Sequence, residues 1–349
     1  MVLELEQLPN DVTEHVAKNL NPRDLIELSF CSEAWFHLIS SFKTRIKELY
    51  INCKELGRTS ENNNLAKALI GVKPFQRSFV HIFVYQRTLE ELDEFSGDPK
   101  TCSRVFGERE LKCQIDKSTI KVFTMDPIDT FYSVMEHLLN LFTGSIHHVN
   151  FGQCTPNITG IILKLLKMEG ISSCNTLSIP SGGAITSDLL EYLLQNPNLF
   201  CLNINCAVRG SFQFVKEVNI THLSLTYPEW VTNRNILNFH CETINLEDPN
   251  INGIGLNSFI KTWMKTDKKK LKRLSISFCK GWNWEDGNNI FDGIEYELFD
   301  KNLNSGTQFY EDEEKKIDCL NGRNIKRPDG TLATIKCDDL HFYFVVWNY

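Results

Sequence analysis

The sequence of 349 residues has no long apolar run and no dense patch of one charge. No stretch approaches the roughly 18 apolar residues that a membrane-spanning helix needs. Its first ten residues hold no basic segment followed by an apolar one, so we expect no secretory signal and a cytoplasmic or nuclear location. The 37 basic residues are scattered through a chain of net charge −7. We therefore expect neither a membrane nor a nucleic acid as partner.

The sequence also lacks the short motifs that mark common catalytic and metal sites. It has no Gly-x-Ser-x-Gly, His-Glu-x-x-His or Cys-x-x-Cys and no glycine-rich phosphate loop. We therefore expect no enzymatic activity, no cofactor and no metal. The alternative is a cysteine-dependent hydrolase, because His240 precedes Cys241 and because His222 could pair with Cys206 in space. The spread of the twelve cysteines along the chain is more typical of small buried apolar residues in a reducing compartment.

The sequence does contain a compact apolar helical unit near its start. Apolar residues at helical spacing over residues 12–20 predict a first helix. Asn21 before Pro22 has the pattern of a helix start, with Asn21 as N-cap and Pro22 at the first helical position. Ser32 is a second N-cap, and an apolar stripe over residues 35–42 follows it. We expect three short helices with more apolar surface than some forty residues can bury alone.

Two interpretations account for the cover of this apolar surface. In the first, the helices dock on the body of their own chain. In the second, another protein covers them. Either cover is needed, because each Leu, Val or Trp left in water costs about 1.5–3 kcal/mol relative to burial.

The order of residues in this unit resembles the F-box motif. That motif opens with Leu-Pro, turns at Pro-x-Asp-Leu and ends in Ser-x-x-Trp with a following Leu, and this sequence has these steps at residues 8–9, 22–25 and 32–38. F-boxes dock on a Skp-family adaptor, which bridges to a cullin in an SCF ubiquitin ligase. The resemblance implies that the adaptor contacts are Leu8, Pro9, Val12, Leu25, Leu28, Trp35 and Leu38.

Between residues 45 and 148 the sequence predicts mixed strands and helices. Residues 78–85 and 119–123 are rich in β-branched and aromatic residues and predict strands. Residues 129–142 have apolar side chains in helical register. The stretch of residues 91–104, with a glycine and a proline among polar residues, predicts an exposed loop.

A repeat begins at residue 149. Six short strands of apolar-polar-apolar pattern start at residues 149, 177, 202, 223, 244 and 274, at intervals of 21 to 30 residues. Helices are expected within 185–194 and 257–264. This spacing is typical of leucine-rich repeats, whose strands stack into a parallel sheet. The alternative is an ordinary α/β domain in which common strand patterns recur by coincidence.

In such a solenoid the apolar strand residues point inward and the residues between them line an open face. We expect that face to be polar, almost uncharged and suited to hydrogen-bonded recognition of a protein surface. Its members, the predicted polar face, are Ser178, Asn203, Asn205, Ser224, Thr226, Asn245, Glu247, Ser275 and Ser277.

Two charged runs and the C-terminal stretch complete the pattern. The basic run 265–273 is interpreted as a solvated helix end, and the acidic run 310–316 as an exposed loop. Residues 325–337 predict a hairpin and residues 341–347 an apolar strand. This tail, with the "KELYINC" after the helical unit, resembles the type-2 F-box-associated region of a large nematode family of F-box proteins.

Together these features predict an α+β or α/β protein with a three-helix F-box at 1–44, a connecting region at 45–148 and an irregular leucine-rich-repeat-like body at 149–349. The predicted function is that of a non-catalytic substrate receptor of a cullin-RING ubiquitin ligase, with an unidentified protein target. The alternative is a ligase-independent interaction scaffold. It rests on Thr13, Ala34 and Phe36, which depart from the usual F-box pattern.

Overall fold

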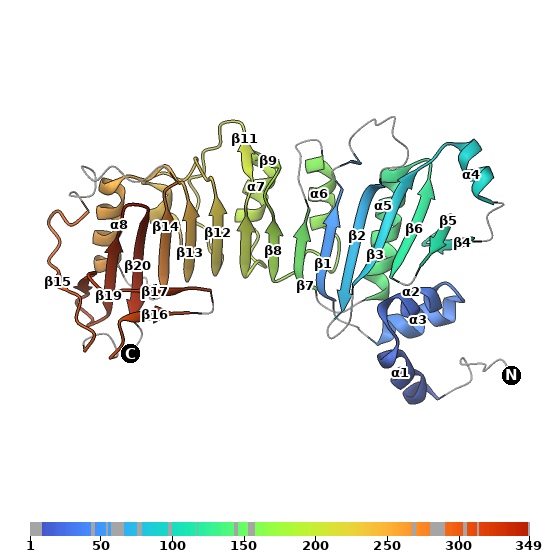
Figure 1. Ribbon diagram of the computed structural model, residues 1–349, viewed down its shortest axis with the longest axis horizontal. Helices are drawn as coiled ribbons and strands as arrows, with labels where there is room; N and C mark the ends of the chain where they lie inside the picture. The colour runs from blue at the N-terminus through green and yellow to red at the C-terminus, as the bar shows by residue number, and fades with distance from the viewer. Residues whose placement is uncertain are drawn as a thin grey trace. The chain divides into compact units, whose positions relative to one another are not determined.

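The structure is a computed structural model with two compact units, Met1–Gly183 and Ala184–Tyr349 (Figure 1). Each unit combines a sheet with helices, so the predicted mixed α and β class is confirmed. The division into three domains stays a prediction. The described residues are 9–42, 46–53, 55–56, 66–74, 79–96, 100–116, 118–142, 146–152, 158–266, 270–279, 290–302, 306–312 and 314–347.

The sheet of unit 1 has the strand order β8-β7-β1-β2-β3-β6-β5-β4. Strands β1 and β7, β7 and β8, and β3 and β6 pair in parallel, and the other neighbours are antiparallel. Helix α6 lies between β7 and β8 in the chain and supplies the crossover that parallel pairing requires. The strands are β1 Ile46–Asn52, β2 Ala66–Pro74, β3 Val80–Gln86, β4 Thr101–Phe106, β5 Arg109–Ile115, β6 Thr119–Thr124, β7 Ile146–Phe151 and β8 Thr176–Ile179.

Short polar side chains cap two of the N-terminal helices of unit 1. The Asn21 side chain accepts from the Asp24 N–H at 2.9 Å, and the Ser32 hydroxyl accepts from the Trp35 N–H at 3.2 Å. Both predicted N-caps are thus confirmed. The helices are α1 Asn10–Asn19, α2 Pro22–Ser29, α3 Glu33–Ser41, α4 Leu89–Ser96, α5 Pro127–Leu141 and α6 Thr159–Leu166.

The core of unit 1 lies between its sheet and α5. Strand β3 alternates, with Val80, Ile82 and Val84 at most 2% exposed and the residues between them half-buried. Helix α5 contacts β2 and β3 and buries Phe131, Val134 and further apolar side chains. Figure 1 shows α5 on one side of these strands. The apolar side chains on one face of the strands and on one face of the helix therefore pack together in one core layer.

The N-terminal helices share this core. Helices α2 and α3 both contact α5, and α2 also contacts β2. The imidazole of His137 on α5 is stacked on Phe30 at 5.0 Å between ring centroids and lies 5.1 Å from Phe36 and 5.3 Å from Phe106. Its Nε2 is 3.0 Å from the Ser29 hydroxyl. The first interpretation, docking on the chain's own body, is therefore correct for part of the apolar surface.

The sheet of unit 2 has the strand order β15-β18-β19-β20-β14-β13-β12-β10. Strands β10, β12, β13 and β14 are parallel and in register, and β14, β20, β19, β18 and β15 follow as antiparallel neighbours. Two further pairs are β9 with β11 and β16 with β17. The strands are β9 Ala184–Thr186, β10 Cys201–Ile204, β11 Ala207–Arg209, β12 His222–Thr226, β13 Thr243–Glu247, β14 Arg273–Ser277, β15 Glu297–Leu298, β16 Phe309–Glu311, β17 Lys316–Asp318, β18 Arg323–Lys326, β19 Leu332–Cys337 and β20 His341–Trp347.

The helices of unit 2 are α7 Ser187–Leu194, the 3-10 helix η3 Asn235–Asn238 and α8 Gly253–Lys265. The Thr186 hydroxyl caps α7, accepting from the Leu189 N–H at 3.5 Å. Helix α8 packs on the sheet through Phe259 and Trp263, whose rings lie 5.4 Å and 5.0 Å from the ring of Phe344 on β20. The predicted C-terminal hairpin and last strand are confirmed as β18, β19 and β20.

The predicted loop over residues 91–104 is wrong for residues 91–96 and 101–104, and residues 97–99 lie outside the described part of the chain. Helix α4 begins at Leu89, and strand β4 begins at Thr101. The missed signal is a capping box, in which Thr88 accepts from the Glu91 N–H at 3.3 Å while the Glu91 carboxylate accepts from the Thr88 N–H at 2.8 Å. This pattern begins at Thr88, three residues before the predicted loop.

Burial lowers the pKa of His137 to about 4 and so makes the stability of unit 1 depend on pH. Between this value and the unfolded pKa of about 6.5 the unfolded chain binds more protons. The free energy of unfolding should therefore fall by about 3 kcal/mol as pH falls from 6.5 to 4. Urea unfolding of wild type and His137→Leu across this range measures the difference.

The exposed His15 on α1 provides the control, since His15→Leu should keep the wild-type pH dependence. Equal pH slopes for wild type and His137→Leu would contradict the assignment of this effect to His137.

Candidate functional site

The register of unit 2 places most of the predicted polar face on one side of four strands. Asn203, Ser224, Asn245 and Ser275 lie side by side across β10, β12, β13 and β14. Thr226, Glu247 and Ser277 form a second row across β12, β13 and β14. Asn205 follows β10, whereas Ser178 belongs to β8 of unit 1, where its hydroxyl lies 2.9 Å from His148 Nε2.

The predicted face is only partly open. Asn205 is exposed, and most of the others are half-buried. Ser275 is 2% exposed, so the expectation that it lines an open surface is wrong. The reason is its neighbour Arg273, two residues earlier on the same face of β14, whose guanidinium donates to the Ser275 hydroxyl at 3.1 Å. Arg273 also makes the face more charged than the sequence predicts.

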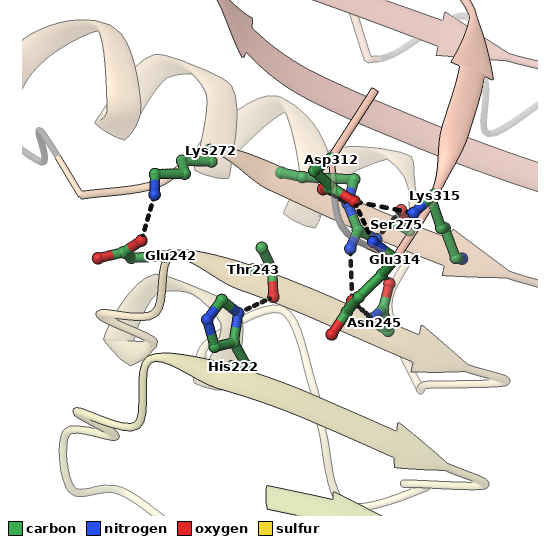
Figure 2. A network of polar contacts seen from close by, with 10 residues as sticks. His222, Glu242, Thr243, Asn245, Lys272, Ser275, Asp312, Glu314 and Lys315 are labelled. Carbon is green, nitrogen blue, oxygen red and sulfur yellow. Dashed lines mark hydrogen bonds and ion pairs between the residues drawn. The ribbon is translucent and has the colours of Figure 1, made fainter. Parts of the chain in front are cut away.

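The Arg273 side chain is fully buried and sits between two carboxylates from the segment joining β16 and β17. Its Nε lies 2.6 Å from Asp312 Oδ2 and its Nη2 lies 2.6 Å from Glu314 Oε2. Its Nη1 donates to the Asn245 side-chain oxygen, and the Asn245 amide donates to Glu314 at 3.1 Å. Figure 2 shows Asn245, Ser275, Asp312 and Glu314 close to one another. We call them the Arg273 cluster: Arg273, Asn245, Ser275, Asp312 and Glu314.

The electrostatics of the cluster favour the charged form of Asp312. Burial alone would raise the pKa of Asp312, but hydrogen bonds from Arg273 and from the N–H groups of Glu314 and Lys315 outweigh it and lower that pKa. Burial, and then the nearby Arg273 charge, lower the pKa of Lys315. Burial, reinforced by Asp312, raises the pKa of Tyr310 to about 12. Around the buried guanidinium, Tyr310 and Lys315 are thus both shifted towards their neutral forms.

Apolar packing holds the same segment against the sheet. Ile317 and Cys319 lie in one buried cluster with Leu332, Val345 and Trp347 of the last two strands. Half-buried Tyr310 and Tyr343 flank it, and the rings of Tyr310 and Trp347 meet edge to face at 5.9 Å. The hairpin of β16 and β17 therefore covers part of the sheet face by both apolar contact and ion pairing.

The two charged runs are consequently not what the sequence suggests. The acidic run 310–316 is not simply an exposed loop, because Asp312 and Glu314 neutralise Arg273. The basic run 265–273 ends in that buried arginine, and its residues 267–269 lie outside the described part of the chain. Around it, Lys272 pairs with Glu242 at 2.6 Å at the surface (Figure 2). The burial of Arg273 and its pairing with Asp312 and Glu314 were not predicted from the sequence.

The second group of predicted contacts lies on the N-terminal helices of unit 1. Pro9 is exposed, Val12 is 41% exposed, and Leu28 and Leu38 are half-buried. Leu8 lies outside the described residues. Side chains that a partner could reach therefore cluster at the start of α1.

Leu25 and Trp35 do not offer free surface to a partner in this conformation. Leu25 is 1% exposed and Trp35 is 6% exposed. Their helices, α2 and α3, pack against α5, so their apolar stripes are covered within unit 1. The expectation that both side chains are available for direct contact is therefore wrong for this structure.

The cysteine and histidine pairs considered as a nucleophile and base have other surroundings. His240 Nε2 lies 3.5 Å from Glu217 Oε1, and His222 Nδ1 lies 2.8 Å from the Thr243 hydroxyl (Figure 2). Cys241 is buried, and burial raises the pKa of Cys206 to about 11. A nucleophilic cysteine needs a lowered pKa, so the geometry does not favour a thiolate here.

In the described part of the chain, no three His, Cys, Asp or Glu side chains come together as a metal site would require. None of the helices described is both long and apolar enough to cross a bilayer.

The Arg273 cluster predicts a large effect of one conservative substitution. Asp312→Asn leaves part of a buried guanidinium charge uncompensated and should lower the free energy of unfolding by about 3 kcal/mol in urea denaturation. Because the pKa of Asp312 is lowered, its stabilising effect is full above the ordinary carboxyl pKa of about 4 and is lost as pH falls through the depressed value.

Glu311→Gln is the matched control in the same hairpin. Glu311 is 65% exposed and pairs with Lys316 at 3.4 Å, so its substitution should cost no more than about 1 kcal/mol. Similar losses for the two variants would contradict a special role of the buried pair.

Two family models match the chain, one on each unit. The model described as F-box domain matches residues 5–47, which contain α1, α2 and α3. The model described as F-box associated, of the second type, matches residues 211–276, which contain β12, β13, α8 and most of β14. Asn245 and Arg273 of the cluster fall within this second match.

Two relatives from Caenorhabditis elegans are similar to the chain. An uncharacterized protein is 21% identical over 384 residues, covering 99% of this chain and 79% of the relative. The E3 ubiquitin-protein ligase hecw-1 is 30% identical over 74 residues, which are 21% of this chain and 6% of that protein. No solved structure matches. The chain thus combines an F-box with a type-2 F-box-associated region, the two parts that its sequence resembles.

Proposed function

We propose that the protein is a substrate receptor of an SCF-type cullin-RING ubiquitin ligase. The observation that supports this most is the occurrence of both matches in one chain, an F-box at residues 5–47 and an F-box-associated region at residues 211–276. In this proposal the first binds a Skp-family adaptor and, through it, a cullin. The second belongs to the body that binds a protein target.

The adaptor surface in this proposal lies at the exposed part of the N-terminal helices. Pro9 and Val12 form its accessible edge. Leu28 on α2 and Leu38 on α3 are half-buried and add part of their surface. Leu25 and Trp35 act indirectly, because their burial holds α2 and α3 in place. Any contact by these two side chains would require α2 and α3 to separate from α5.

The body is a leucine-rich-repeat-like solenoid in this proposal. Its support is the in-register parallel stack of β10, β12, β13 and β14, with buried apolar positions repeated on every strand. The open part of the polar face, around Asn203, Ser224 and Thr226, offers hydrogen-bonding groups to a protein target. The receptor would act by proximity, raising the effective concentration of target lysines near the activated ubiquitin.

A ligase-independent interaction scaffold is the second candidate. Three observations favour it. The first is Thr13, which stands where an aliphatic residue is usual in F-boxes. This residue is 2% exposed, and its hydroxyl donates to the Pro9 carbonyl at 3.1 Å. The other two are the burial of Leu25 and of Trp35, which reduces the surface that an adaptor could use. Co-immunoprecipitation of a cullin with the full chain distinguishes the two candidates, because only the receptor would bring the cullin down.

The adaptor proposal predicts a loss of binding from substitutions at the exposed edge. In a pull-down with a Skp-family adaptor, Val12→Asp should reduce capture at least about tenfold, since it places a charge in an apolar contact. The thermal unfolding temperature should stay near that of wild type, because Val12 is 41% exposed. His37→Asp, an exposed position on α3, is the control and should bind normally.

Failure of the intact chain to capture the adaptor would remove the receptor proposal. Unchanged capture by Val12→Asp would instead remove the assignment of the contact to this edge.

A further inference from the structure

Unit 1 carries a row of aromatic side chains on the sheet face that points away from its core. Phe79, His81, Phe83 and Tyr85 alternate along β3 and the residue before it, and Tyr85 lies opposite Phe123 of β6. Successive ring centroids are 5.6, 6.4, 6.3 and 5.6 Å apart. We call these five residues the aromatic strip. It lies outside both family matches, and neither the F-box nor the F-box-associated region accounts for it.

The strip is not part of the core. The residues that alternate with it on β3, Val80, Ile82 and Val84, are buried on the face that α5 covers. The ring of Phe123 is 4% exposed, but the other four strip residues are half-buried and keep part of their surface in water. Four aromatic side chains side by side at the surface are typical of an interaction site, since each gains free energy when a partner covers it.

Cations surround the strip. Lys73 Nζ lies 5.1 Å from the ring centre of Phe79, and the Arg87 guanidinium lies 5.5 Å from the ring centres of both Tyr85 and Phe123. By register Lys121 lies opposite Phe83, and Lys112 opposite Phe123.

In the described part of unit 1, anionic groups lie next to two of these cations. Glu48 is paired by register with Lys73, and Asp116 lies 3.9 Å from Lys121. The strip and its border are thus positively charged in a chain whose net charge is −7. This complementarity favours an acidic partner.

Single-stranded nucleic acids and acidic peptides both bind surfaces that combine aromatic rings with basic side chains. The geometry of the rings distinguishes between these two ligands. Phe79 and His81 are stacked at an interplanar angle of 10°, and the Lys73 and Arg87 cations lie over the faces of Phe79, Tyr85 and Phe123. Neighbouring rings and cations therefore occupy ring faces that single-stranded nucleic acid would need for base stacking. Ring edges, which carry the positive end of the quadrupole, suit carboxylates and the side chains of a peptide.

We propose that the aromatic strip is a docking surface for an extended acidic segment of a partner protein. At about 3.3 Å per residue, the seven residues from 79 to 85 span about 20 Å, which matches a partner segment of six to seven extended residues. Apolar side chains of the segment cover the rings, and its carboxylates pair with Lys73, Arg87, Lys112 and Lys121. This surface is separate from the proposed adaptor edge, and its existence does not depend on ligase membership.

The test uses a random 12-residue phage-displayed peptide library on the immobilised full-length protein. Parallel selections use Phe83→Ala and Arg87→Glu, and Lys326→Glu, an exposed lysine of unit 2, is the control for charge reversal. We expect peptides enriched in Asp and Glu with interspersed apolar residues on wild type and on the control. By fluorescence anisotropy an enriched peptide should bind each strip variant at least about tenfold more weakly.

Arg87→Glu keeps the test valid if Phe83→Ala fails to fold, as judged from the thermal unfolding temperature. No strip-dependent enrichment, or enrichment without an excess of acidic residues, would overturn the proposal. Strip-dependent binding of a 12-nucleotide oligouridylate that is tighter than that of any selected peptide would also overturn it, in favour of nucleic acid. Adaptor capture by Arg87→Glu should equal that of wild type. Peptide selection thus tests the aromatic strip, and adaptor capture separately tests the receptor proposal.

Discussion

The alternation of side chains across strands in register is the constraint on which this protein depends. In unit 2 the pairing of β10, β12, β13 and β14 places their apolar side chains on a buried face and their polar side chains on the opposite face. In unit 1 the same alternation along β3 separates Val80, Ile82 and Val84 from the aromatic strip. A shift of one residue in either register would exchange core and surface, so fold and candidate surfaces are specified together.

Both units cover part of the surface that their sequences suggest is available. In unit 1, α5 receives α2 and α3, and His137 lies among the rings of Phe30, Phe36 and Phe106. In unit 2, the hairpin of β16 and β17 lies over β14 and supplies the carboxylates for Arg273. Burial without such partners would be costly in both places, because a neutral imidazole and a guanidinium each need specific neighbours in a dry environment.

Local patterns in the sequence predict much of this structure. The caps Asn21 and Ser32 and the hairpin and last strand of the C-terminal tail follow from rules that act over a few residues. The family resemblance rests on the fixed order of a few residues near the N-terminus. The six short strands predicted from residue 149 onward are found as β7, β8, β10, β12, β13 and β14.

What the sequence could not predict is decided by contacts between distant residues. The burial of Arg273 depends on Asp312 and Glu314, which lie 39 and 41 residues later in the chain. The burial of Ser29 next to His137 depends on a contact across 108 residues. The alternation of Phe79, His81, Phe83 and Tyr85 was visible as a strand, but its accessible face depends on which side α5 occupies. No periodicity carries such information, because it describes a segment and not its neighbours.

The contact between the N-terminal helices and α5 has a mechanical consequence. Helices α2 and α3 pack with buried side chains against α5, and α5 packs against β2 and β3. The two helices therefore cannot rotate independently of this sheet without breaking those contacts. A partner bound to these helices would therefore be held at a fixed angle to the sheet of unit 1. It would also be held at a fixed angle to a segment bound along β3. Substitutions at His137 or its aromatic neighbours would alter that angle and the rigidity of the contact between these helices and α5. They would do so without changing a residue that contacts either bound protein.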